Sequence, residues 1–131
     1  MPRQSGLEAS AGLISGPFLL IATNKVFVYI EMQVSAPFDQ MPWPAINERM
    51  LQVPGMLSKT WLHGLNSHSN GAFYEFDSLE NAQTFAWEIF PLEARGAGVS
   101  FTTKLFDGDV VAEASRAMRS PYYLEQPRAS M

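Results

Sequence analysis

The sequence predicts an α+β domain of the ferredoxin-like type, with the element order β-α-β-β-α-β. Two observations favour this fold. Two segments, residues 42–53 and 77–90, place apolar side chains at helical spacing. Four segments alternate between two kinds of side chain, as strands with one buried face do, and these are residues 25–34, 56–63, 72–76 and 99–106. Two helices cover only one face of a four-stranded sheet, so something else must cover the other face.

Length and composition indicate one globular domain. The chain has 131 residues, of which 47% are hydrophobic and 17% are charged. A net charge of −4 and a pI of about 5.0 argue against a nucleic-acid partner. The absence of Cys excludes disulfides, thiolate nucleophiles and Cys-based metal sites. The apolar run FLLIA at residues 18–22 is too short to span a membrane, so we expect a cytoplasmic protein with no membrane partner.

Three parts are expected along the chain. Residues 1–16 are rich in Gly, Ser and Ala, and residues 1–24 are predicted to form a flexible N-terminal extension, with an extra edge segment as the alternative. Residues 25–120 form the ferredoxin-like domain. Residues 121–131 form a C-terminal tail, which we expect to be flexible from Tyr122 onward.

The first strand, KVFVYIEMQV, has one aliphatic side that should face the core, made of Val26, Val28, Ile30, Met32 and Val34. The other side consists of Phe27, Tyr29, Glu31 and Gln33. Three prolines within residues 37–44 exclude a strand there, and Pro42 or Pro44 suits the first turn of a helix. Ile46, Met50 and Val53 then lie on one helical face, and Pro54-Gly55 ends the helix.

The second strand decides where the candidate site lies. We expect one set of side chains to face the helices, namely Met56, Ser58, Thr60 and Leu62. The opposite set is Leu57, Lys59, Trp61 and His63. A register slip of one residue would exchange the two sets. Residues 64–70 form a polar loop with Asn70-Gly71 as its turn, and the third strand then directs Tyr74 and Phe76 toward the helices.

Asp77 is the expected N-cap of the second helix, with Glu80 three residues later as in a capping box. The apolar stripe of this helix is Leu79, Ala82, Phe85, Ala86 and Ile89. Pro91 and the turn at residues 96–98 should end it. The fourth strand, residues 99–106, is followed by a short helix through Val111, Ala114 and Met118, which Pro121 stops.

The face turned away from the helices carries five large aromatic side chains and two charges of each sign. Its predicted members are Phe27, Tyr29, Glu31, Lys59, Trp61, His63, Phe73, Glu75, Thr102, Lys104 and Phe106. A face left in water rarely carries so many aromatics, and such a patch marks an interface or a ligand site. Mixed charges suit cross-strand pairs beside a wet cavity. The simplest interpretation is a homodimer through this sheet face, with a pocket between the two sheets.

Three segments of the chain, PGMLSKTW, GAFYEFDSLENAQTF and KLFD, together with APF before the first helix, resemble the YdhR-like mono-oxygenase family. These are dimeric α/β-barrel proteins related to the antibiotic-biosynthesis monooxygenases. The resemblance covers residues 25–113. It implies a ferredoxin-like dimeric α/β barrel, a homodimer and mono-oxygenase activity. The N-terminal extension through Asn24 departs from the compact family pattern.

We therefore expect a small mono-oxygenase that uses no cofactor and acts on a hydrophobic, aromatic or polyketide-like molecule. His63 is the candidate catalytic base. The candidate substrate-binding residues are Trp61, Tyr29, Lys59, Glu31, Phe73 and Glu75. The same residues also fit plain structural roles: a surface histidine at a strand end, aromatic dimer packing, and ion pairs between the lysines and glutamates. Two other functions fit the pocket, a cyclase, isomerase or dehydratase that only transfers protons, and a non-catalytic ligand-binding or stress-related dimer.

Metal and cofactor motifs are not recognisable in the sequence. His68 follows His63 by five residues without a carboxylate at strand or helical spacing, which predicts no metal site. Ser67 and Ser69 beside His68 lack the strand-turn-helix elbow of a nucleophile. The Gly96-Ala97-Gly98 turn lacks the following helix that a dinucleotide loop requires, so no classical cofactor fingerprint is present.

Overall fold

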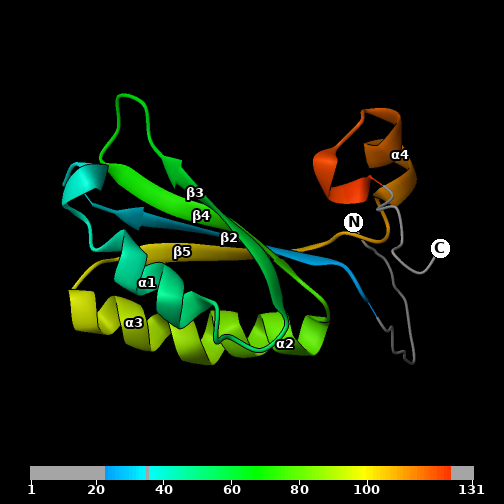
Figure 1. Cartoon of the computed structure of the whole chain (residues 1–131). Coiled ribbons are helices and arrows are strands. Elements are labelled where there is room, and N and C mark those ends of the chain that lie inside the picture. The colour runs from blue at the N-terminus through cyan, green and yellow to red at the C-terminus, as the bar shows by residue number, and fades with distance from the viewer. Residues whose placement is uncertain (1–22, 35, 125–131) are drawn as a thin grey trace.

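The computed structural model describes residues 23–34 and 36–124, which form a four-stranded antiparallel sheet with helices (Figure 1). The strands are β2 (Val26–Gln33), β3 (Met56–His63), β4 (Ser69–Phe76) and β5 (Phe101–Asp107), in the spatial order β3-β4-β2-β5. Helix α1 (Trp43–Met50) joins β2 to β3, and α2 (Leu79–Thr84) and α3 (Phe90–Ala97) lie between β4 and β5. This is the ferredoxin-like order of elements that the sequence predicts.

The three helices α1, α2 and α3 all lie on one face of the sheet (Figure 1). The core between the two layers is apolar, as the alternation in β2 and β4 predicts. Its buried members include Val26, Val28, Ile30, Ala72, Tyr74, Phe76, Ala82, Phe85, Ala86, Phe90 and Ala94. The aliphatic side of the first strand and the Tyr74 side of the third are therefore confirmed as the core faces.

The loop between β3 and β4 turns earlier than predicted. β4 begins at Ser69, so Asn70 and Gly71 are strand residues, and the left-handed backbone conformation is at Asn66, with φ 57°. Glycine is required at position 71 because a Cβ there would lie 2.2 Å from the carbonyl oxygen of Ile30 in the neighbouring strand.

Residues 79–97 form a continuous helix that passes through Pro91, so the predicted end at this proline was wrong. Phe85–Ile89 is a π-helical segment, in which the backbone N–H of Phe90 donates to the carbonyl of Phe85. The wider turn tolerates a proline in the next turn and adds one residue to the helix. The buried stripe consequently moves from the predicted Ile89 to Phe90 and Ala94. The helix ends at Gly98, with φ 71°.

The N-cap of α2 is Ser78 instead of the predicted Asp77, because the Ser78 hydroxyl accepts from the backbone N–H of Asn81 at 3.1 Å. Asp77 instead accepts a hydrogen bond from the side-chain amide of Asn81 at 2.9 Å.

The predicted face assignment of β3 was wrong from Ser58 onward. A register shift between Met56 and Ser58 inserts one residue, Leu57, relative to β4. Beyond it, Lys59 pairs with Tyr74 and Trp61 pairs with Ala72, both of which belong to the helix-facing core. Because the side-chain period of a strand is two, the bulge turns Lys59, Trp61 and His63 toward the helices and Thr60 away from them.

The chain's own C-terminal segment covers part of the face opposite the helices. The turn η4 (Pro121–Tyr123) follows α4 (Ala112–Ala117), and the ring of Tyr122 lies 5.2 Å from Phe73 and 5.6 Å from Phe27. Tyr123 is buried and donates to the carbonyl of Gly108 at 2.7 Å. The first residues of the predicted tail are therefore part of the fold.

The predicted N-terminal extension falls mostly on residues 1–22, which lie outside the described residues. At its end, the backbone N–H of Asn24 donates to the Asp109 carboxylate at 2.7 Å. Asp109 belongs to the turn after β5, so residue 24 is joined to the domain.

Candidate functional site

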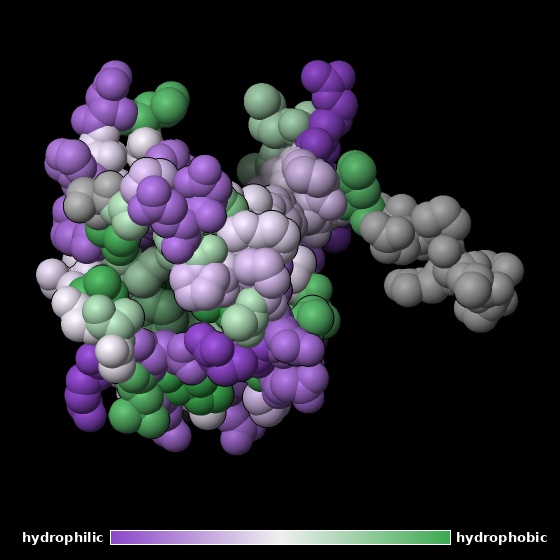
Figure 2. Space-filling model, turned by 60° about the vertical axis from the view of Figure 1, so that its left-hand side comes forward, coloured by the Kyte–Doolittle hydropathy of each residue, from purple (hydrophilic) through white to green (hydrophobic). Residues whose placement is uncertain are grey.

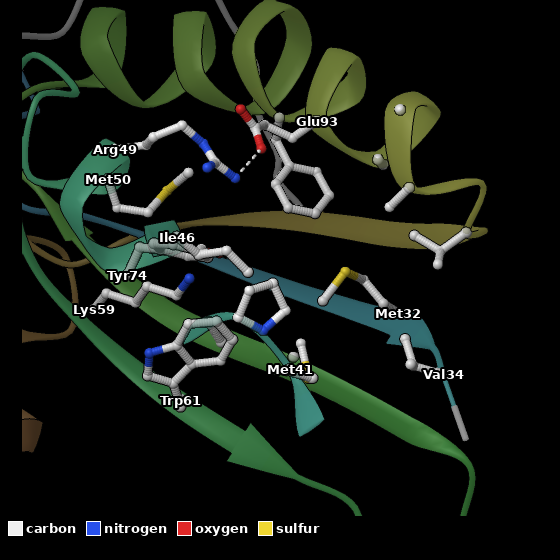
Figure 3. Close-up of a pocket in the computed structure, with 18 of the residues that line it drawn as sticks. Met32, Val34, Met41, Ile46, Arg49, Met50, Lys59, Trp61, Tyr74 and Glu93 are labelled. Atoms are coloured by element: carbon white, nitrogen blue, oxygen red, sulfur yellow. Dashed lines mark hydrogen bonds and ion pairs between the residues drawn. The ribbon is translucent and has the colours of Figure 1, made fainter. Parts of the chain in front are cut away.

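A cavity of about 620 Å³ lies between the sheet and the helices, on the face that contains the core. Figure 2 shows a hollow with a hydrophobic floor between hydrophilic side chains, and Figure 3 shows the residues around it. Its wall comes from β2, β3, β4, α1 and α3, and includes Met32, Val34, Met41, Pro42, Ile46, Arg49, Met50, Lys59, Trp61, Gly71, Ala72, Tyr74, Phe90, Leu92, Glu93 and Ala94. This cavity lies within one chain, and the predicted pocket between two sheets stays a prediction.

Lys59 contributes a largely buried amine to this cavity. Its Nζ lies 3.5 Å from the centre of the Trp61 ring and 5.4 Å from that of Tyr74, on the inner side of β3. Burial lowers the pKa of Lys59 to about 8, because desolvation penalises the ammonium form, while Glu93 raises it and Arg49 lowers it further. Among the described residues, no carboxylate lies within ion-pair distance of this amine. An amine with this pKa exchanges protons near neutral pH.

The indole of Trp61 is held in one orientation. Its Nε1 donates to the side-chain oxygen of Asn47 in α1 at 2.9 Å, and Phe38 packs edge-on against the ring at 5.3 Å. Trp61 is therefore a fixed aromatic part of the cavity wall, with the Lys59 amine over its ring.

Tyr74 supplies a neutral hydroxyl to the same cavity. Burial raises the pKa of this phenol, so it stays protonated at physiological pH. The Tyr74 side chain is only 2% exposed and belongs to the cavity lining.

Arg49 and Glu93 form an ion pair between α1 and α3 in the cavity wall, with Nη2 and Oε1 3.0 Å apart (Figure 3). The side chains are 53% and 36% exposed, which identifies this pair as belonging to the solvent-facing part of the wall. Pairs in such a setting contribute about 1 kcal/mol or less.

His63 lies outside the cavity, contrary to its predicted position on the pocket side. Its ring is exposed at the end of β3, and Nδ1 is hydrogen-bonded to the side-chain oxygen of Asn70. The Asn70 amide donates in turn to the sulfur of Met41 at 3.3 Å. These contacts give His63 a structural partner, and its predicted catalytic role stays a prediction.

The remaining predicted site residues lie on the opposite face of the sheet from Lys59 and Trp61. Tyr29 donates to Glu31 at 2.9 Å, which raises the pKa of the Tyr29 phenol. Glu75 forms an ion pair with Lys25 at 2.6 Å. Phe73 stacks on Phe27 with ring centres 4.9 Å apart, beneath Tyr122. The predicted group of six substrate-binding residues is thus divided between two faces.

Sequence reasoning assigned Tyr74, Arg49 and Glu93 no functional role. Tyr74 was predicted to face the helices, and that position brings it into the cavity wall. Arg49 and Glu93 come from two different helices, and no sequence pattern links them. Three methionines, Met32, Met41 and Met50, also line the cavity, where their flexible side chains adapt to a ligand's shape.

Within residues 23–34 and 36–124, no group of three or more His, Asp or Glu side chains is arranged to hold a metal ion. Over the same part of the chain, no helix has the length and apolar character needed to cross a bilayer.

No protein-family model and no curated protein matches the chain. Solved structures that are similar to it include the following two. A variant of SnoaB, a cofactor-independent oxygenase from Streptomyces nogalater, has 15% identity and a TM-score of 0.47 over 63% of this chain and 91% of its own. A "putative monooxygenase" from Shewanella loihica has 19% identity and a TM-score of 0.40 over 66% of this chain and 94% of its own. At these identities and TM-scores, the similarity to these two structures says nothing about the function of this chain.

Proposed function

We propose that the protein is a mono-oxygenase that needs no cofactor and acts on a planar, hydrophobic phenol in the cavity between sheet and helices. The observation that carries this proposal is the Lys59 amine, which lies in an apolar cavity against the Trp61 ring with its pKa lowered to about 8. Such a group accepts a proton from a phenol near neutral pH, and the aromatic wall positions a flat ring beside it.

The proposed reaction begins with transfer of the phenol proton to the Lys59 amine. The resulting phenolate has carbanion character at its free para carbon, which forms a C–O bond with dioxygen as O₂ is reduced to a bound hydroperoxide. Loss of water from that carbon then leaves a quinone. One phenol and one O₂ yield one quinone and one water, so atoms and electrons balance without another reductant.

The residues around Lys59 have distinct parts in this scheme. The ammonium formed by the first step stabilises the phenolate, and the Tyr74 hydroxyl donates a hydrogen bond to its oxygen. The apolar wall excludes bulk water, which strengthens both interactions. Lys59 thereby takes the role of base that the sequence suggested for His63.

Oxygen consumption on a panel of phenols and 1-naphthols with a free para carbon tests the function. We expect wild-type protein to consume one O₂ per quinone formed, without releasing hydrogen peroxide. His63→Ala should retain the activity, within about twofold, because His63 lies outside the cavity. If no member of a broad panel supports uptake, the oxygenase proposal is wrong. Isomerised or cyclised products without uptake would instead indicate a proton-transfer enzyme, which the same amine would serve.

We also propose a homodimer through the part of the open sheet face that the C-terminal segment leaves uncovered. This part includes Tyr29, Glu31 and Lys104, together with Phe106, which is 47% exposed. A two-fold copy would place Lys104 against the partner's Glu31 and bury Phe106.

Phe106→Glu should give a monomer in size-exclusion chromatography with light scattering at micromolar concentration, because the substitution would bury a charge in the dimer interface. Val110→Glu, at a site 78% exposed, is the control. A monomeric wild type would refute this assembly.

A further inference from the structure

We propose that Arg49 is a specificity-determining residue that binds a carboxylate on the ligand, so that the ligand is an aromatic acid with a phenolic group at its other end. The inference deepens the proposed function. It rests on that function only for the phenolic group of the ligand. It assigns the Arg49–Glu93 pair a ligand-binding role in place of a structural one.

The cavity wall carries more positive than negative charge. Arg49 and Lys59 are two cations, whereas Glu93 is the single carboxylate among the described lining residues. Glu93 is bonded to Arg49, which leaves the Lys59 amine without an anionic partner in the described part of the chain. An excess positive charge in an apolar cavity favours an anionic ligand, even though the whole chain carries a net charge of −4.

Arg49 has N–H donors that the described residues leave unused. A guanidinium has five N–H donors, and within residues 23–34 and 36–124 the side chain of Arg49 makes one hydrogen bond, from Nη2 to Glu93. A carboxylate can accept two parallel bonds from such a fork. Because the pair with Glu93 is half exposed, it is weak enough to be exchanged for a ligand carboxylate.

The charged groups lie on two sides of the cavity. Lys59 comes from the sheet and contacts Trp61, whereas Arg49 and Glu93 come from the helices that form the opposite side of the cavity (Figure 3). A flat ligand lying between the sheet and the helices would then direct one polar end to Lys59 and the other to Arg49. A cavity of about 620 Å³ accommodates a fused two-ring acid of this kind.

Calorimetric titration with 6-hydroxy-2-naphthoic acid and with its methyl ester tests the inference. The titrations are done under nitrogen, so binding is measured without oxygenation. We expect wild-type protein to bind the acid at least about tenfold more tightly than the ester. Arg49→Met should abolish this preference by weakening acid binding alone. Glu93→Gln should tighten acid binding, because it removes the competing carboxylate.

Arg95→Met is the matched control, since Arg95 is an exposed residue of α3 outside the cavity lining. It should leave both affinities unchanged. Equal binding of acid and ester by the wild type, equal losses for both ligands in Arg49→Met, or no binding of either ligand would overturn the inference. A clear acid preference in a protein that consumes no oxygen would support the inference while counting against the oxygenase.

Discussion

Lys59→Met is expected to lower kcat/KM for oxygen consumption by at least about 10²-fold, the usual contribution of a positioned general base. Methionine keeps the length and apolar stem of lysine but cannot accept the phenol proton. In wild-type protein, kcat/KM should rise with pH around a midpoint near 8, because the amine is a base only when neutral and its pKa is about 8. Initial rates from an oxygen electrode across pH 6–10 measure both effects.

The same substitution should stabilise the fold at pH 7, by about 1 kcal/mol, because it removes a desolvated charge without an ionic partner. The pKa of Lys59 is about 8 when folded, below the 10.5 of a free lysine. The unfolded chain therefore binds more protons between these values, and the wild type gains stability as pH rises through that window. The advantage of Lys59→Met should be largest below pH 8 and should fade toward pH 10.5.

Arg95→Met is the control for both measurements, since Arg95 is an exposed cationic residue of α3 outside the cavity lining. It should change neither the rate nor the pH dependence of stability. A loss of activity accompanied by a loss of stability in Lys59→Met would indicate a damaged fold instead of a missing base. Retained activity in Lys59→Met would remove Lys59 from the mechanism.

Tyr123→Ala is expected to reduce the free energy of unfolding by about 3 kcal/mol. The Tyr123 side chain is 7% exposed, packs edge-on against Phe27 with ring centres 6.0 Å apart, and lies under the Lys25 ammonium at 4.9 Å. The substitution also leaves the carbonyl of Gly108 without its hydroxyl donor. Urea denaturation, followed by tryptophan fluorescence, measures the change.

Two neighbours separate the contributions of ring and hydroxyl in this C-terminal turn. Tyr122→Phe keeps the ring between Phe27 and Phe73 and removes only the bond to Thr60, so it should cost about 1 kcal/mol. Leu124→Ala, at a site 57% exposed, should change stability by no more than about 0.5 kcal/mol. A loss below about 1 kcal/mol for Tyr123→Ala would mean that the turn detaches readily from the sheet.

The order of elements and the core faces of two strands were predictable because they depend on patterns repeated over many residues. The alternation in β2 runs through eight residues, Val26–Gln33, and one misjudged residue would not change its direction. The composition of the cavity was not predictable in the same way. It depends on single irregularities, such as the extra residue Leu57 in β3, which no repeating pattern in the sequence predicts.

β3 illustrates the difference. Its predicted bounds agree with the structure, and Met56 faces the core as expected. Ser58 and Thr60 are poor core residues, which was a signal that the strand changes sides, but the alternation alone gives no position for the change. The partner strand decides it, because Lys59 must lie opposite Tyr74 once Leu57 bulges.

Two elements of the cavity wall, β3 and α3, each contribute side chains that follow an irregularity of one residue, Leu57 in β3 and the π-helical segment before α3. Removing either residue would leave the paired strands and the helix in place but would present a different set of side chains to the ligand. A substitution changes one side chain of such a wall. A one-residue deletion would instead change which side chains of the whole element face the cavity. In evolutionary terms, ligand specificity on this scaffold is open to abrupt change through insertions and deletions at these two positions.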